Sequence, residues 1–88
     1  MTKNKLELLR KKINKVDHQL LIIMAKRMKI VNQIKKLKKK ERMAIENKQR
    51  EKQVLIRLKK LAKKLNLSVV FVDKLFKIII EESKRVQK

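Results

Sequence analysis

Two cations, Arg27 and Lys38, lie on an otherwise apolar stripe of a long helical pattern that runs from Leu6 to Lys40. They are eleven positions apart, so on a helix they share one face, about 20° apart in rotation and roughly 16 Å apart along the axis. A cation that faces a core is costly unless an anion meets it. Their long side chains could therefore close on one small ligand, such as a dicarboxylate, from its two ends.

Arg10 stands near the other end of the same pattern and cannot join that pair within one chain. It precedes Arg27 by 17 positions, which is about 25 Å of helix and about 100° of rotation. No single straight helix brings both guanidinium groups to one small ligand. If the two arginines share a site, Arg10 must come from a second copy of the chain.

Other polar residues lie on the inward stripes of two shorter helical patterns. Arg50 and Glu51 stand at the start of the second pattern, and Ser83 and Gln87 continue the apolar stripe of the third. Each alone has an ordinary interpretation, because long cations at the edge of a stripe usually extend to water. Together they place cations, one acid and neutral hydrogen-bonding groups on inward faces. This combination is more informative about a binding site than any one of the residues.

The inventory of residues excludes most other kinds of catalysis. The sequence has no cysteine, no glycine, one histidine (His18) and eight acidic residues. Because its only histidine stands beside Asp17 near mid-helix, we see no Ser/His/Asp or Cys/His set. The missing glycine excludes a glycine-rich phosphate loop, and we expect neither a metal nor a cofactor. An enzyme built from these residues would depend on positioning and electrostatic stabilisation.

Three helices must position these residues. Apolar residues recur at steps of three and four through three separate stretches. This spacing predicts an all-α fold with helices at about 5–40, 48–64 and 69–87. No alternation of period two indicates a strand.

Polar residues with suitable side chains stand at the expected helix ends. We expect Thr2 or Asn4 to cap the first helix, Asn47 the second and Ser68 the third. Asn66 is expected to end the second helix in a left-handed conformation.

The first helix is too long for one small chain to cover. Roughly 35 residues give a rod of about 50 Å, and much of its stripe has the spacing of a two-stranded seam. The 88 residues form one small domain, 1–88, near the size at which a lone core is only marginally stabilising. We therefore expect a homodimer in which two such rods pack together.

The formal net charge is +20. Such a charge is typical of nucleic-acid or anionic-membrane surfaces, but also of solvated helix faces in a lysine-rich sequence, which we favour. Phe71 and Phe76 are the only aromatic residues, too few for a platform that stacks single-stranded bases. No apolar run approaches the roughly 18 residues of a membrane span and no signal-peptide core is visible, so we expect a cytoplasmic protein.

Several short motifs carry a resemblance to a known family. They are Leu9-Arg10-Lys11-Lys12-Ile13, Val16-Asp17, Leu20-Leu21, Ala25-Lys26-Arg27, Arg50-Glu51, and the run from Leu75 to Ser83 followed by Gln87. At this spacing the whole chain resembles the all-helical chorismate mutases, most closely the mutase domain of bifunctional chorismate mutase–prephenate dehydratases. The resemblance implies an isomerase of the shikimate pathway that converts chorismate to prephenate in aromatic amino acid biosynthesis, leading to phenylalanine and tyrosine. It also implies an intertwined homodimer with two equivalent sites.

The resemblance also implies a role for each cation and hydrogen-bonding residue. Arg10 of the partner subunit and Arg27 would hold the two carboxylates of the substrate, with Ser83 assisting. Lys38 and Gln87 would hydrogen-bond the ether oxygen, where negative charge grows as the C–O bond breaks.

The remaining implied contacts involve the start of the second helix and the site walls. Glu51 would accept from the ring hydroxyl, and Arg50 would support a carboxylate or orient Glu51. Asn47, where the family usually has Asp, would contact the substrate largely through its backbone. The walls, which favour the compact diaxial conformer, would be formed by Ile34, Val54 and Ile80.

Two alternatives stay open from the sequence. A lyase that splits pyruvate from isochorismate shares the fold, although Glu51 and Arg50 favour the mutase. A basic helical dimer that binds nucleic acid and has no activity is the alternative from another class.

Overall fold

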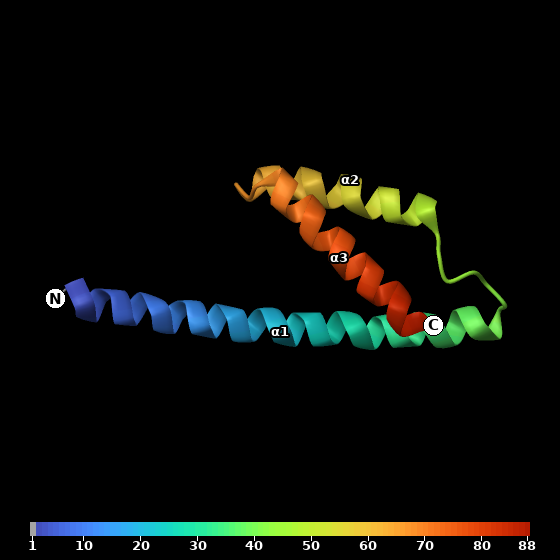
Figure 1. Cartoon of the computed structure of the whole chain (residues 1–88), viewed down its shortest axis with the longest axis horizontal. Coiled ribbons are helices and arrows are strands. Elements are labelled where there is room, and N and C mark those ends of the chain that lie inside the picture. The colour runs from blue at the N-terminus through green and yellow to red at the C-terminus, as the bar shows by residue number, and fades with distance from the viewer. Residues whose placement is uncertain (1) are drawn as a thin grey trace. The chain divides into compact units, whose positions relative to one another are not determined.

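The computed structural model describes residues 2–88, and within that range the chain forms three α-helices and no strand (Figure 1). The helices are α1 (Thr2–Lys40), α2 (Lys48–Lys64) and α3 (Val69–Gln87). The predicted all-α fold is confirmed, and α2 and α3 have the predicted bounds. The first helix begins at Thr2 rather than near Lys5, so Thr2 and Asn4 lie inside α1 and not at its cap.

The chain divides into two compact units, Met1–Ile30 and Val31–Lys88. In the first unit, the large apolar side chains of the predicted stripe are all at least 45% exposed. They are Leu6, Leu9, Ile13, Val16, Leu20, Ile23 and Ile30. Helices in proteins gain most of their stability from packing of such a face, so this part of α1 presents a surface suited to a further apolar partner.

The second unit contains the core of the single chain. α2 and α3 pack against each other, and α3 turns back after the end of α2 (Figure 1). The buried apolar side chains of this unit are Val31 of α1, Ala62 of α2, and Val72, Ile79 and Ile80 of α3. Four of these five belong to α2 and α3. Packing between these two helices therefore forms most of the core of this unit.

The N-terminal caps of α2 and α3 are the predicted ones. The side-chain oxygen of Asn47 accepts from the backbone N–H of Arg50 at 3.0 Å. The hydroxyl oxygen of Ser68 accepts from the N–H of Phe71 at 3.2 Å. Each cap satisfies a backbone donor that the helix itself leaves without a partner.

Two helices end in left-handed residues that are not glycine. Asn66 has a φ of 57°, and the N–H of Leu67 bonds the carbonyl of Ala62 at 2.9 Å. Arg42 has a φ of 55° after α1, and there the N–H of Met43 bonds the carbonyl of Lys38 at 2.8 Å. The Asn66 stop was predicted. The Arg42 stop was not, because arginine costs roughly 1 kcal/mol in this conformation.

None of the helices within residues 2–88 combines the length and the apolar character that crossing a membrane requires.

Candidate functional site

Six of the eight predicted site residues lie in the second unit, at the ends of its helices. They are Lys38 near the end of α1, Asn47, Arg50 and Glu51 at the start of α2, and Ser83 and Gln87 near the end of α3. The other two, Arg10 and Arg27, lie in the first unit.

Lys38 is half-buried and bound to the loop that leads to α2. Its Nζ donates to the backbone carbonyl of Ile45 at 2.7 Å. An ammonium group has three N–H donors in total. This bond therefore fixes the direction of the side chain and leaves two donors for a ligand.

Glu51 lies in the first turn of α2, where its negative charge is stabilised by the helix dipole. Its Oε1 lies 3.4 Å from the Nζ of Lys84. Its Oε2 is buried and accepts no hydrogen bond from any residue in 2–88. The neighbouring Arg50 is exposed, and its bond to Asn47 is made by its backbone and not by its guanidinium.

Ser83 and Gln87 occupy successive turns of α3. Ser83 is buried, and its hydroxyl donates to the carbonyl of Ile79 at 2.8 Å. The Nε2 of Gln87 donates to the carbonyl of Ser83 at 3.1 Å. One N–H of the Gln87 amide is therefore still available, and its Oε1 is buried with no hydrogen-bond partner in the described chain.

Glu51 Oε2 and Gln87 Oε1 are the buried side-chain N or O atoms without a partner in the described part of the chain. A buried acceptor without a donor typically costs about 1–3 kcal/mol. Groups of this kind in a folded protein call for an explanation, and a ligand-binding role is one of them. Both oxygens belong to residues that the sequence had indicated as substrate contacts.

Lys84 is a residue of this region that the sequence reasoning missed. Its Nζ lies 2.9 Å from Glu81, 3.4 Å from Glu51 and 3.5 Å from Glu46, and its side chain is only 17% exposed. The hydrogen bond to Glu81, opposed by burial and reinforced by the charges of all three carboxylates, raises the pKa of Lys84 above its ordinary value. Its spacing from Glu81 on α3 was a local signal, but the contact with Glu51 was not visible in sequence.

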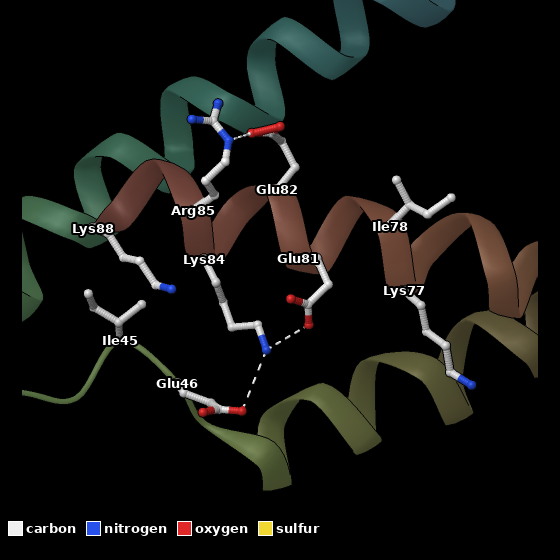
Figure 2. A pocket seen from close by; sticks show the side chains of 9 residues that line it. All are labelled: Ile45, Glu46, Lys77, Ile78, Glu81, Glu82, Lys84, Arg85 and Lys88. Atoms are coloured by element: carbon white, nitrogen blue, oxygen red, sulfur yellow. Dashed lines mark hydrogen bonds and ion pairs between the residues drawn. The ribbon is translucent and has the colours of Figure 1, made fainter.

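An open groove of about 950 Å³ lies beside this cluster (Figure 2). It is lined by Ile45 and Glu46 of the loop, by α3 side chains between Lys77 and Arg85, and by Lys88 after the end of α3. Figure 2 shows Lys84 extending from α3 toward Glu46 and Glu81. Since none of the eight predicted site residues lines the groove, the groove is distinct from the candidate site.

The two arginines of the first unit differ in their surroundings. Arg27 is half-buried, and this burial lowers the pKa of its guanidinium from the ordinary value. Arg10 is exposed and pairs with Glu7, one helical turn away, at 3.4 Å. Arg10 is thus accessible to a second molecule at the surface of α1.

No group of three or more His, Cys, Asp or Glu side chains that could hold a metal ion occurs within residues 2–88.

Comparison with known proteins points to one family. The model of the family described as chorismate mutase type II matches residues 9–88. The bifunctional chorismate mutase/prephenate dehydratase of Buchnera aphidicola subsp. Schizaphis graminum is 40% identical over 87 residues, which are 99% of this chain and 23% of that protein. The protein of the same description from Buchnera aphidicola subsp. Acyrthosiphon pisum is 38% identical over 85 residues, 97% of this chain and 22% of that protein.

A relative of similar length is the chorismate mutase of Methanocaldococcus jannaschii. It is 33% identical over 84 residues, which are 96% of this chain and 85% of that protein. The chain therefore spans less than a quarter of the two bifunctional relatives and most of this third one.

Proposed function

The chain belongs to the type II chorismate mutase family, whose members are isomerases, and from this premise we propose that it rearranges chorismate to prephenate. The structural observation that carries the proposal is the pair of buried acceptors without partners, Glu51 Oε2 and Gln87 Oε1. Both lie on residues to which the family resemblance gives substrate contacts. The ring hydroxyl of the substrate, by donating to Glu51 Oε2, would remove the cost of leaving that oxygen unpaired.

The reaction is unimolecular, and the proposed site acts by binding the transition state more tightly than the substrate. No nucleophile is needed. Lys38 and the free N–H of Gln87 would donate to the ether oxygen, and these bonds would strengthen as that oxygen gains negative charge. Ile34, Val54 and Ile80 would favour the compact diaxial conformer by their shape.

The carboxylates of the substrate would be held by arginines. Arg27 and Arg10 of the partner subunit would each bind one carboxylate, with assistance from Ser83. Because a guanidinium group can donate two parallel hydrogen bonds to a carboxylate, such pairs orient the ligand as well as attract it. Holding both ends of the substrate in a reactive geometry supplies part of the rate enhancement.

The ring hydroxyl would meet the start of α2. Glu51 would accept a hydrogen bond from this hydroxyl through Oε2, which has no donor within residues 2–88. Arg50, which is exposed, would support a substrate carboxylate. Asn47 would contribute through its backbone, since its side chain caps α2.

A homodimer is part of this proposal. Its support is the apolar stripe of α1, from Leu6 to Ile30, which is exposed along its whole length in the single chain. A second copy of α1 would bury this stripe by coiled-coil packing. The same pairing would bring Arg10 of one subunit to the site of the other.

The test is to follow chorismate by its absorbance with and without the purified protein, and then to identify the product. We expect accelerated loss of chorismate and formation of prephenate. Release of pyruvate from isochorismate, with no prephenate, would instead support a lyase of the same fold.

An Arg27→Ala variant, with Lys26→Ala as the neighbouring exposed control, separates the mutase from a nucleic-acid-binding dimer. Arg27→Ala should abolish most of the activity and Lys26→Ala little of it. If chorismate loss is not accelerated by the wild-type protein, and nucleic acid binds both variants alike, the proposed function is refuted.

A further inference from the structure

Lys84 joins three segments of the second unit by charge. Its Nζ lies 3.5 Å from Glu46 in the loop before α2, 3.4 Å from Glu51 in the first turn of α2, and 2.9 Å from Glu81 in α3. Figure 2 shows two of these contacts, to Glu46 and Glu81. One ammonium thus holds three carboxylates that would otherwise repel one another.

The contact with Glu51 has a geometric consequence. A carboxylate is planar, so a contact that holds one of its oxygens also restricts the position of the other. Lys84 contacts Oε1 of Glu51, while Oε2 is buried and has no hydrogen-bond partner in the described chain. The lysine therefore presents Oε2, rather than Oε1, to whatever ligand lies beside it.

We propose that Lys84 is a positioning residue for the mutase reaction. It holds Glu51 so that Oε2 of Glu51 accepts a hydrogen bond from the ring hydroxyl of chorismate. This inference rests on the proposed function and adds to it a residue outside the predicted set. Lys84 does not itself touch the substrate. It acts through the carboxylate of Glu51.

Arg50, the cation nearest to Glu51 in sequence, does not supply this contact in the single chain. Arg50 is exposed, and its hydrogen bond to Asn47 is made by its backbone N–H. Lys84, which comes from α3, is 33 positions from Glu51 and is only 17% exposed. A lysine in such a half-enclosed place holds its partner in one position better than an exposed arginine does, since exposed ion pairs are weak.

The same contact couples two parts of the proposed site. Lys84 follows Ser83 directly and precedes Gln87 by three positions on α3, whereas Glu51 lies on α2. The ion pair therefore links the end of α3, which carries the amide, to the start of α2, which carries the carboxylate.

The first experiment compares kcat/KM for the wild-type protein, Lys84→Met and Lys84→Arg. Methionine keeps an unbranched side chain only one atom shorter and removes the charge. We expect a loss of about tenfold for Lys84→Met, near the lower end of the range for a hydrogen bond to a charged group because the Lys84–Glu51 contact is long, at 3.4 Å. Lys84→Arg should recover most of it. Lys77→Met is the matched control, because Lys77 is an exposed α3 lysine whose ion pair with Asp73 measures 2.9 Å. It should retain wild-type activity.

A double-mutant cycle with Glu51→Gln distinguishes positioning from a purely structural role. If Lys84 acts through Glu51, Lys84→Met should cost about tenfold in the wild-type background and close to nothing in the Glu51→Gln background. Equal losses in both backgrounds would overturn the inference, and so would a Lys84→Met variant as active as the wild type.

The remaining outcomes separate this inference from the proposed function. If Lys84→Met does not fold, Lys84→Gln replaces it in the same cycle, with the same expected and contradicting results. If the wild-type protein itself does not consume chorismate, the proposed function fails and this inference fails with it. An active wild type with an equally active neutral variant overturns this inference alone.

Discussion

Replacement of Lys38 by alanine tests the proposed site, and the expected fall in kcat follows from the donors of its ammonium group. In the single chain, one of its three donors is bound to the carbonyl of Ile45 at 2.7 Å. Removing a donor that stabilises a developing oxyanion typically raises the barrier by on the order of 3–4 kcal/mol. The turnover number kcat of Lys38→Ala should therefore fall roughly 100- to 1000-fold.

The bond to Ile45 adds a separate and smaller effect. Its loss should cost about 1 kcal/mol of folding stability, which appears in thermal unfolding and not in the chemical step. Lys39→Ala is the control, since Lys39 is exposed and adjacent in sequence. The assay is the initial rate of chorismate loss at saturating substrate, with the fold checked by circular dichroism.

Two results would refute the reasoning on Lys38. The first is a folded Lys38→Ala variant that turns over at the wild-type rate. The second is an equal loss in Lys39→Ala, which would show that the general positive charge matters and not one placed donor.

Three further predictions concern the dimer, the amide and an ion pair within α3. An Arg10→Ala chain mixed with an Arg27→Ala chain should recover activity that neither has alone, because each heterodimer regains one intact site; inactive mixtures that contain heterodimer would contradict the shared site. In Gln87→Glu, kcat/KM should fall as the pH rises through the pKa of the new carboxyl, because only its protonated form donates; a pH–rate profile as flat as that of the wild type would count against the role of the amide. The hydrogen bond from Lys77, opposed by burial and aided by nearby lysine charge, lowers the pKa of Asp73 below its ordinary 3.8. The ionised Asp73 therefore adds stability at pH values above 3.8, and this stability is lost as the pH falls through the lowered pKa. The difference in melting temperature between the wild type and Asp73→Asn should accordingly be small and positive at neutral pH and should vanish in acid; a difference that does not change with pH would contradict it.

Much of the fold was predictable because its signals are local. The caps Asn47 and Ser68 and the stop at Asn66 are confirmed, since each depends on side-chain and backbone groups within a few residues. The left-handed stop at Arg42 was missed, because arginine carries no preference for that conformation and the end of α1 is set by its surroundings.

The family was also predictable, and the match over residues 9–88 confirms it. The homodimer and the roles of the individual site residues stay predictions. They concern a second chain and a substrate, and the exposed stripe of α1 and the buried acceptors of Glu51 and Gln87 support them without testing them.

The sequence by itself determined the three helices and the caps of α2 and α3, and it predicted which residues would bind the substrate. Periodicity and capping are written within a few positions, so one chain is enough to specify them. Only the tertiary structure decided that Lys84, and not Arg50, holds Glu51, and that one oxygen each of Glu51 and Gln87 is buried without a partner. Those facts depend on the packing of α3 against α2, which brings together residues 33 positions apart.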